Sequence, residues 1–265
     1  MTFLVRSPAV FDNDEIIQKY IKSDKAIIVR GDGLSQSDVQ HAWDEAGKTG
    51  TVDVVLFSVG MCCALPCYGF LPCNVGGTPK FGLSQGFYIT PPNLVTQCFL
   101  NTMCTMPADL RGPNSQLRFI VVTSTGLTKS SHASLPFPIR FLYYFIRQPH
   151  KDKIGTERIA FHVSGKEWNN AEAAEPGEEI MGLDWANREG LPPFGSFKGF
   201  LLVRPLLLTD GVCLGDNEGA KAPYRVSEEG IYSWTVSRKD VGHFISDAIL
   251  AKWDDYKNKV VNIGY

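Results

Sequence analysis

Two uninterrupted apolar runs constrain the fold of this chain more than any other feature. "VDVVLFSVG" spans residues 52–60, "LRFIVVTSTG" spans residues 117–126, and each run ends at a glycine. A strand with one face in water alternates apolar and polar residues, whereas these runs are apolar at most positions. We therefore predict two strands that are buried on both faces, as in a parallel sheet with helices on either side.

The other segments alternate between strand-like and helix-like patterns. Strands are predicted at residues 2–7, 25–32 and 199–211, and helices at 13–24, 35–47, 92–106, 152–163 and 237–253. This alternation predicts an α/β protein with a doubly wound parallel sheet. Residues 165–198 are rich in Gly, Pro, Glu and Asn, and we expect them to form a long surface excursion.

The composition argues against several classes of partner. The 265 residues carry a formal net charge of −2, which gives no basis for general binding to nucleic acids or membrane surfaces. No run reaches about 18 apolar residues, so no membrane span is predicted. The first residues, "MTFLVRSPAVFDNDE", lack the apolar stretch of a signal peptide. We expect a cytoplasmic or nuclear protein whose partner is a small-molecule substrate.

Seven short motifs, taken together, resemble one protein family. They are "LVRSP", "VRGD", "VLFSVG", "VVTSTG", "DKIGTE", "LLVRPLLLTDG" and "SRKDVGHFI", in this order. Their order and spacing resemble the atypical short-chain dehydrogenase/reductases, especially the NmrA-like or NAD(P)-binding-domain group common in fungi. The resemblance implies an incomplete Rossmann-like sheet. It makes residues 1–164 the dinucleotide-binding region and residues 165–265 a substrate-side region that completes the same domain.

The resemblance also shows what this sequence lacks. In that family "LVRSP" belongs to the second strand, and the first strand carries a glycine-rich turn that holds the dinucleotide pyrophosphate at a helix N-terminus. We find no counterpart of that strand or turn. In the usual order the first strand is central, so without it either its neighbours close up or the sheet splits and exposes apolar edges.

The resemblance assigns the remaining cofactor contacts. Arg6 and Ser7 lie where the family binds the 2′-phosphate of NADP, and a guanidinium matches a phosphate in charge and geometry. The other expected contacts to adenine, ribose and nicotinamide are Asp32, Gly33, Ser58, Val59 and Gly60. The expected cofactor is NADP, with NAD as the alternative. The purely structural alternatives are an exposed arginine at a strand end and ordinary strand-to-loop turns.

The expected catalytic residues are Lys153, Ser124 and Thr125. Lys153 resembles a family lysine that can hold a ribose hydroxyl and lower the pKa of a proton donor. The Y-x-x-x-K motif of ordinary members is absent, because the residue four before Lys153 is Pro149. In the structural alternative, Lys153 is a solvated helix residue paired with Glu157, and the two hydroxyls cap strand-end backbone groups.

Three functions fit these observations. The first is an NAD(P)H-dependent reductase or isomerase of a small organic substrate. The second is a non-catalytic dinucleotide sensor, and the third is a truncated or repurposed fold that binds no dinucleotide. His132, Tyr143 and Tyr144 are candidates for lining a substrate pocket.

Four of the seven cysteines lie close together, at Cys62, Cys63, Cys67 and Cys73. Their spacing is not a usual zinc pattern, and disulfides are rare in a reducing cytosol, so no metal site is predicted. Removal of residues 61–76 joins the flanking motifs as "VLFSVGGTPKF". Codons at the two ends can spell fungal intron boundaries, so we interpret this stretch as a translated intron, with a genuine insertion as the alternative. Either way we expect a protruding loop.

Overall fold

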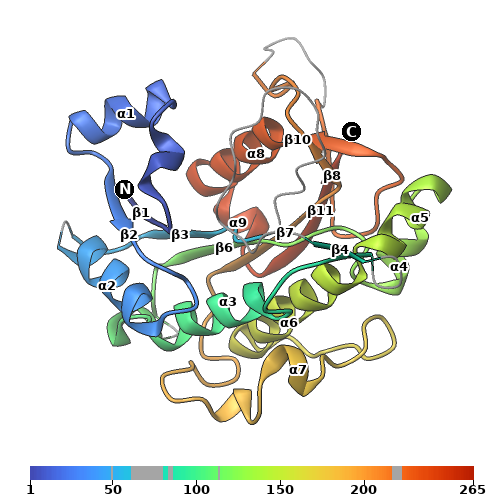
Figure 1. Cartoon of the computed structure of the whole chain (residues 1–265), viewed down its shortest axis with the longest axis horizontal. Helices are drawn as coiled ribbons and strands as arrows, with labels where there is room; N and C mark the ends of the chain where they lie inside the picture. The colour runs from blue at the N-terminus through green and yellow to red at the C-terminus, as the bar shows by residue number, and fades with distance from the viewer. Residues whose placement is uncertain (49, 61–79, 83–85, 113, 217–222) are drawn as a thin grey trace.

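The computed structural model describes residues 1–48, 50–60, 80–82, 86–112, 114–216 and 223–265 (Figure 1). The stretch interpreted above as a translated intron, with its four cysteines, lies outside these residues. Among the described residues, no helix has both the length and the apolar character needed to cross a bilayer.

A five-stranded sheet forms the centre of the molecule. Its strand order is β3 (Val54–Phe57), β6 (Arg118–Val122), β7 (Phe200–Pro205), β11 (Lys259–Gly264) and β9 (Arg225–Ser227). The first four strands are parallel, and β9 pairs antiparallel with β11 at the edge. The predicted α/β class with a mostly parallel sheet is confirmed, and the sheet combines strands from both halves of the sequence.

The two N-terminal strands form a sheet of their own. β1 (Thr2–Val5) pairs in parallel with β2 (Ile27–Arg30), and neither strand hydrogen-bonds to β3. In Figure 1 this pair lies on the β3 side of the central sheet. Of the two outcomes expected for a sheet without its central strand, the split is therefore confirmed, at the position where the resemblance places that strand.

Helices cover both faces of β6 and β7. On one face lie α2 (Gln36–Gly47), α3 (Leu94–Cys104), α6 (Arg147–Ser164) and α7 (Glu178–Met181), and on the other lies α8 (Arg238–Leu250) (Figure 1). The α3–α6 side is packed with aromatic rings, including Phe99, Phe119 and Phe200. On the other side Ile120 and Leu201 pack with Phe244 of α8. These side chains are removed from water, which is the main stabilising contribution to the fold.

β3 departs from the predicted burial on both faces. Val55 and Phe57 pack into the α3–α6 core, but Val54 is 37% exposed and Leu56 is 51% exposed. Successive residues of a strand point to opposite faces, so these two share the face on which α8 lies. The residues of α8 pack over β6, β7 and β11 and not over β3. The prediction therefore holds for β6 and for only one face of β3.

Three helices begin at a side-chain cap. Asp14 accepts hydrogen bonds from the first backbone N–H groups of α1 (Glu15–Lys22), and Ser35 and Ser237 cap α2 and α8 in the same way. A side-chain oxygen at this position satisfies backbone donors that the helix itself leaves unpaired. Gly47, expected just beyond α2, is its last residue.

Two helices were not predicted, and one starts early. α4 (Lys129–Ala133) and α5 (Phe137–Phe145) follow β6, and α6 begins five residues before the predicted start at 152. Pro138 and Pro149 lie in the first turns of α5 and α6, where a missing N–H costs nothing.

The surface excursion predicted at residues 165–198 is partly wrong. It contains α7, and its Ile180, Met181 and Phe197 are buried in the core. The remaining short elements are β4 (Lys80–Gly82) with β5 (Gly86–Tyr88), β8 (Leu207–Thr209) with β10 (Thr235–Ser237), α9 (Trp253–Tyr256), and 3-10 turns at Pro8–Phe11, Ala108–Leu110 and Trp185–Asn187.

Candidate active site

Lys153 reaches from α6 to the carboxyl ends of two neighbouring strands. Its Nζ donates a hydrogen bond to the carbonyl oxygen of Thr123, just after β6, at 2.7 Å. A Cβ atom placed on Gly60, just after β3, would lie 3.9 Å from the same Nζ. The structure therefore brings Lys153 together with Gly60 and with the strand end that carries Ser124. The carboxyl ends of parallel strands are the usual location of active sites in α/β sheets.

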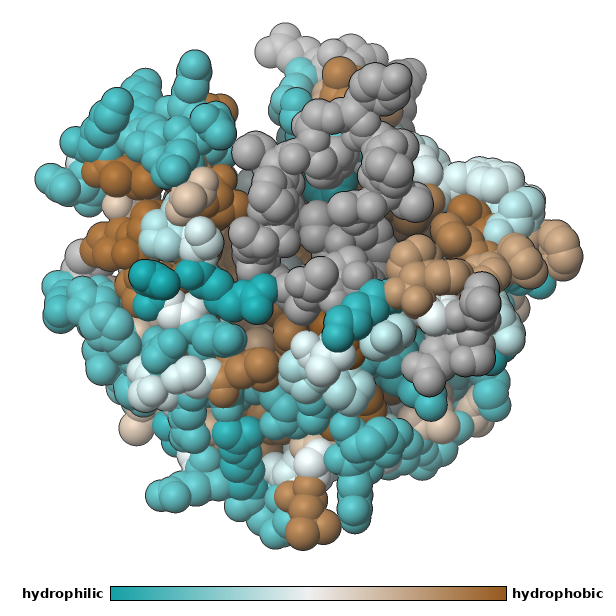
Figure 2. Space-filling view, viewed as in Figure 1, coloured by the Kyte–Doolittle hydropathy of each residue, from teal (hydrophilic) through white to brown (hydrophobic). Residues whose placement is uncertain are grey.

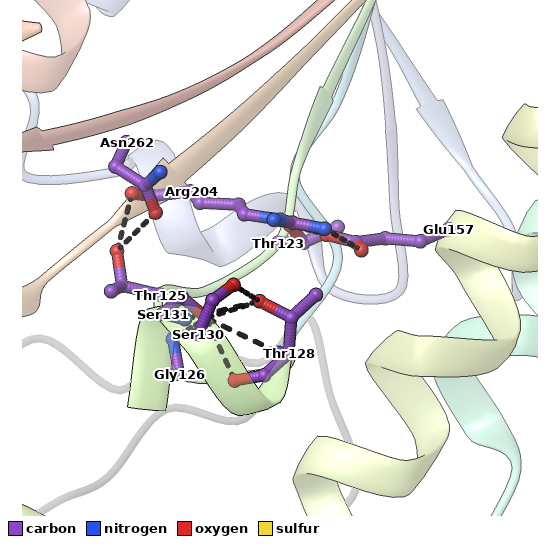
Figure 3. A network of polar contacts seen from close by, with 9 residues as sticks. All are labelled: Thr123, Thr125, Gly126, Thr128, Ser130, Ser131, Glu157, Arg204 and Asn262. Carbon is purple, nitrogen blue, oxygen red and sulfur yellow. Dashed lines mark hydrogen bonds and ion pairs between the residues drawn. The ribbon is translucent and has the colours of Figure 1, made fainter. Parts of the chain in front are cut away.

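A buried ion pair holds this part of α6 in place (Figure 3). Glu157, one helical turn after Lys153, accepts hydrogen bonds from Arg204 Nε at 2.9 Å and Nη2 at 2.5 Å. Thr123 Oγ1 donates to the same carboxylate at 2.6 Å. Glu157, Arg204 and Thr123 are all buried, and the bidentate geometry fixes the orientation of both charged groups. This network ties α6 to β6 and β7 and so positions Lys153.

The two predicted strand-end hydroxyls point in different directions. Thr125 is buried, and its Oγ1 donates to the carbonyl oxygen of Arg204 at 2.7 Å and lies 3.2 Å from Asn262 Oδ1 (Figure 3). Its hydroxyl therefore ties the strand end to β7 and β11. Ser124 instead lies close enough to Tyr143 of α5 to lower the pKa of its phenol. Of the two, only Ser124 faces a side chain with acid–base chemistry.

Tyr143 is the main residue of this cluster that the sequence did not assign to catalysis. Its side chain is 4% exposed, and burial raises its pKa to about 12, an effect that the neighbouring Ser124 hydroxyl opposes. Its ring packs directly on Gly126, where a Cβ atom would lie 2.3 Å from Tyr143 Cε1. Gly126 also has φ = +84°, so only glycine suits this position.

Two histidines adjoin Tyr143. The ring centroid of His150 lies 4.7 Å and that of His132 6.1 Å from the ring of Tyr143. Burial, followed by the charges of Lys153 and His132, lowers the pKa of His150 to about 3. Burial also lowers the pKa of His132. A phenol with a raised pKa therefore lies next to imidazoles that are neutral at physiological pH.

The sequence search missed Tyr143 because it looked for a tyrosine four residues before Lys153. Tyr143 is ten residues before it, on a different helix, and the α5–α6 junction at Ile146 brings the two helices together. The sequence did contain a signal for this cluster, because Tyr143 and His150 lie seven residues apart and shortly before Lys153. An open pocket of about 510 Å³ lies beside this cluster, and its lining includes Gly126, His132 and Ile154.

The expected adenine-side residues lie at the ends of the separate β1–β2 pair. Gly33 packs against Cys98 of α3, where an added Cβ atom would lie 2.8 Å from the sulfur. Burial raises the pKa of the Cys98 thiol to about 12, and the charges of Asp32 and Arg6 both act on it. Arg6 and Asp32 are therefore brought near each other, beside α3. Ser7 follows Arg6 and caps nothing with its side chain.

The loop that carries Asp32 is held by its own hydrogen bonds. The backbone N–H of Asp32 donates to Asp38 Oδ2 at 2.8 Å, and Asp32 Oδ1 accepts from Leu34 N at 3.0 Å. The first of these bonds is the main reason that the pKa of Asp38 is lowered. The remaining predicted contacts follow β3, where Ser58 is exposed and Val59 is half-buried against the core.

The N-terminus of α3 does not provide an anion site. The buried carboxylate of Asp152 accepts hydrogen bonds from Val95 N and Thr96 N, both at 2.8 Å. Burial raises the pKa of Asp152, and these backbone donors oppose the shift. The first N–H groups of the helix are thus satisfied within the protein and cannot also cradle a pyrophosphate. Among the described residues no group of His, Cys, Asp and Glu side chains is arranged to hold a metal ion.

Comparison with known proteins supports the fold and part of the sequence resemblance. No protein-family model matches the chain. Reductase pytE of Aspergillus terreus is 27% identical over 149 residues, which cover 55% of this chain and 47% of that protein. The chain thus spans about half the length of this curated relative.

Solved structures are similar over nearly the whole chain. ChuY, an anaerobillin reductase from Escherichia coli O157:H7, is 13% identical, with a TM-score of 0.52 over 99% of this chain and 83% of that one. A wide-type short-chain dehydrogenase/reductase from Veillonella parvula DSM 2008, solved with NADP, is 12% identical, with a TM-score of 0.47 over 100% of this chain and 82% of that one. At these identities the likeness to ChuY establishes the α/β fold alone.

Proposed function

We propose that this chain is an NADPH-dependent reductase of a small carbonyl compound, in the atypical, NmrA-like group of short-chain dehydrogenase/reductases. The observation that carries the proposal is the place of Lys153 at the ends of β3 and β6, where Ser124 adjoins the buried phenol of Tyr143. Ser124 and Tyr143 supply a hydroxyl and a phenol suited to an oxyanion that develops on a substrate, and Lys153 hydrogen-bonds to the residue before Ser124.

In this proposal the residues of the chain donate the proton, and the cofactor supplies the hydride. NADPH, when bound, supplies a hydride to the carbonyl carbon of the substrate. The Tyr143 hydroxyl donates its proton to the carbonyl oxygen, and the neighbouring Ser124 hydroxyl, which lowers the pKa of Tyr143, stabilises the phenolate that remains. Lys153, which donates a hydrogen bond to the Thr123 carbonyl oxygen, is proposed to hold a ribose hydroxyl of the cofactor. A raised pKa keeps Tyr143 protonated at neutral pH, as a proton donor requires.

Residues at the two ends of the site fit the two ends of a dinucleotide. The middle of the site offers less to bind the pyrophosphate. Arg6 suits a 2′-phosphate, Asp32 suits a hydroxyl or amino group, and Gly60 leaves room beside Lys153. The pyrophosphate has no glycine-rich turn in this sequence, and the start of α3 is capped by Asp152. We therefore propose that NADPH binds through its ends, and more weakly than in a complete Rossmann sheet.

We also propose the cytoplasm as the setting. The described cysteines Cys98, Cys104 and Cys213 are free thiols, which suits a reducing compartment.

The test combines binding and turnover on the 265-residue chain. NADPH binding is measured by fluorescence titration, and turnover by loss of NADPH absorbance with a panel of small ketones, aldehydes and enones. We expect saturable binding, turnover of at least one compound, and a loss of kcat of about 10²–10⁴-fold in Tyr143→Phe. Tyr144→Phe, a change in an exposed neighbour, is the matched control and should retain activity.

The alternatives give different results. Saturable binding without turnover of any compound supports a dinucleotide sensor. Conversion of a substrate without net loss of NADPH supports an isomerase. The absence of NADPH binding rejects the proposal and leaves the repurposed fold.

A further inference from the structure

The outer face of α5 exposes aromatic side chains. Phe137 is 79%, Phe141 64% and Tyr144 50% exposed. Their spacing of four and three residues places them on one side of the helix, while Ile139 and Tyr143 on the other side are buried. Exposed single apolar residues are common, but three aromatic rings on one helical face form a contiguous patch that needs an explanation.

The patch continues onto the β4–β5 hairpin. The ring of Phe145 lies 5.4 Å from that of Phe141 and 6.5 Å from that of Phe81, which is itself 54% exposed. We call Phe81, Phe137, Phe141, Tyr144 and Phe145 the α5 aromatic surface. In Figure 2 brown and tan atoms gather on the right of the view, where α5 lies in Figure 1.

The segment that contains α5 carries charges of one sign. Residues 129–151 contain no Asp or Glu. Their basic residues, all exposed, are Lys129, Arg140, Arg147 and Lys151. The guanidinium of Arg147 lies 3.9 Å from the ring centroid of Tyr144, so a cation and an aromatic ring form one unit at the surface. This local excess of positive charge contrasts with the net charge of −2 for the whole chain.

We infer that the α5 aromatic surface docks on an anionic lipid bilayer. Phe side chains partition into the boundary between headgroups and acyl chains, Tyr favours the headgroup level, and basic residues are attracted to anionic lipids. A protein partner would also bury aromatic residues and arginine, but lysines are depleted in such interfaces. α5 has only nine residues, so it lies on the bilayer and does not span it. This inference differs from the sequence-based expectation of no membrane partner, and vesicle binding distinguishes the two.

Because α5 also carries Tyr143, docking of this surface would affect which substrates reach the site. The same helix presents Tyr143 to Ser124 on its inner side. A docked α5 brings the proposed proton donor next to the lipid, where an apolar carbonyl compound would be concentrated. This last step rests on the proposed function, whereas docking itself does not.

The test is vesicle flotation of the 265-residue chain without cofactor. Vesicles of phosphatidylcholine with phosphatidylserine are compared with phosphatidylcholine alone, at low and at high salt. We expect binding to the anionic vesicles, weakened by salt, and a loss of about tenfold or more in the double variant Phe137→Ser/Phe141→Ser. Leu183→Ser/Leu250→Ser removes two equally exposed apolar side chains elsewhere and should bind as the unaltered chain does.

A second pair of changes tests the charge. Arg147→Gln/Lys151→Gln should reduce binding to anionic vesicles by about thirtyfold, since each basic residue near the surface contributes about 1 kcal/mol. Circular dichroism confirms that each variant is folded. Absence of vesicle binding overturns the inference, as does equal binding to neutral vesicles. A dimer that the phenylalanine changes dissociate, without vesicle binding, would assign the surface to a second copy. Because no cofactor is present, failure here leaves the proposed reductase activity intact.

Discussion

β3 and β6 are neighbouring parallel strands with similar sequences and very different surroundings. In β6, Phe119, Ile120 and Val121 are completely buried between helices on both faces. In β3, Val55 and Phe57 are packed while Val54 and Leu56 face solvent, and the next strand along, β1, does not hydrogen-bond to it. An apolar run therefore indicates a strand, but whether the strand is buried depends on which elements lie beside it.

The same contrast divides the candidate site. On the β6 side, Lys153, Ser124 and Tyr143 are held by a buried ion pair and by close packing on Gly126. On the β1 side, Arg6 and Asp32 follow a two-stranded sheet, and the Asp32 loop is held by local hydrogen bonds. The groups proposed for proton transfer are thus better preorganised than those proposed for the dinucleotide.

The largest effect is expected at the ion pair that anchors the β6 side. Glu157→Gln leaves the buried charge of Arg204 uncompensated and should lower the free energy of unfolding by about 3–5 kcal/mol. Urea denaturation measures this. The double variant Glu157→Met/Arg204→Met should recover most of the loss, because no unpaired charge remains. Lys257→Met, at the exposed pair with Asp254, is the control and should cost less than about 1 kcal/mol. Equal losses of stability at the buried and at the exposed ion pair would contradict the contrast between the two regions.

A matched pair of leucines tests the two strands directly. Leu201→Ala, at a fully buried position in β7, should cost about 3 kcal/mol through lost burial and the cavity left behind. Leu56→Ala in β3 removes the same atoms from a half-exposed position and should cost less than about 1 kcal/mol. Thermal and urea unfolding of both variants provide the comparison. A cost at Leu56 as large as that at Leu201 would show that β3 is covered on both faces in solution.

The smallest effect concerns pH. The pKa of His150 is about 3 in the folded chain, below the ordinary value of about 6.5. Between these values the unfolded chain binds a proton that the folded chain does not, so stability is retained above pH 6.5 and falls as the pH drops toward 3. At pH 5 the expected loss is about 2 kcal/mol.

The pH effect is measured by urea denaturation at several pH values. His150→Gln should show a shallower decline than the unaltered chain. His41→Gln, at an exposed position on α2, should keep the original profile. Identical profiles for the unaltered chain and His150→Gln would show that His150 is not the group responsible.

Much of the fold could be predicted because its signals are local. The caps at Asp14, Ser35 and Ser237 and the apolar runs of β3 and β6 depend on a few adjacent residues. α5 was not predicted from the sequence. Tyr143 was missed because its distance from Lys153 along the chain does not reflect their distance in space. The roles of Arg6, Asp32, Ser124 and Lys153 remain predictions that the experiments above address.

The sequence by itself determined the α/β class and the alternation of the main strands and helices, since these follow from short-range patterns. Only the tertiary structure decided that the sheet splits beside β3, that Thr125 ties β6 to β7 and β11 while Ser124 faces Tyr143, and that α5 presents its aromatic residues outward. Each of these depends on contacts between segments far apart in the chain, where packing selects among arrangements that local preferences leave open.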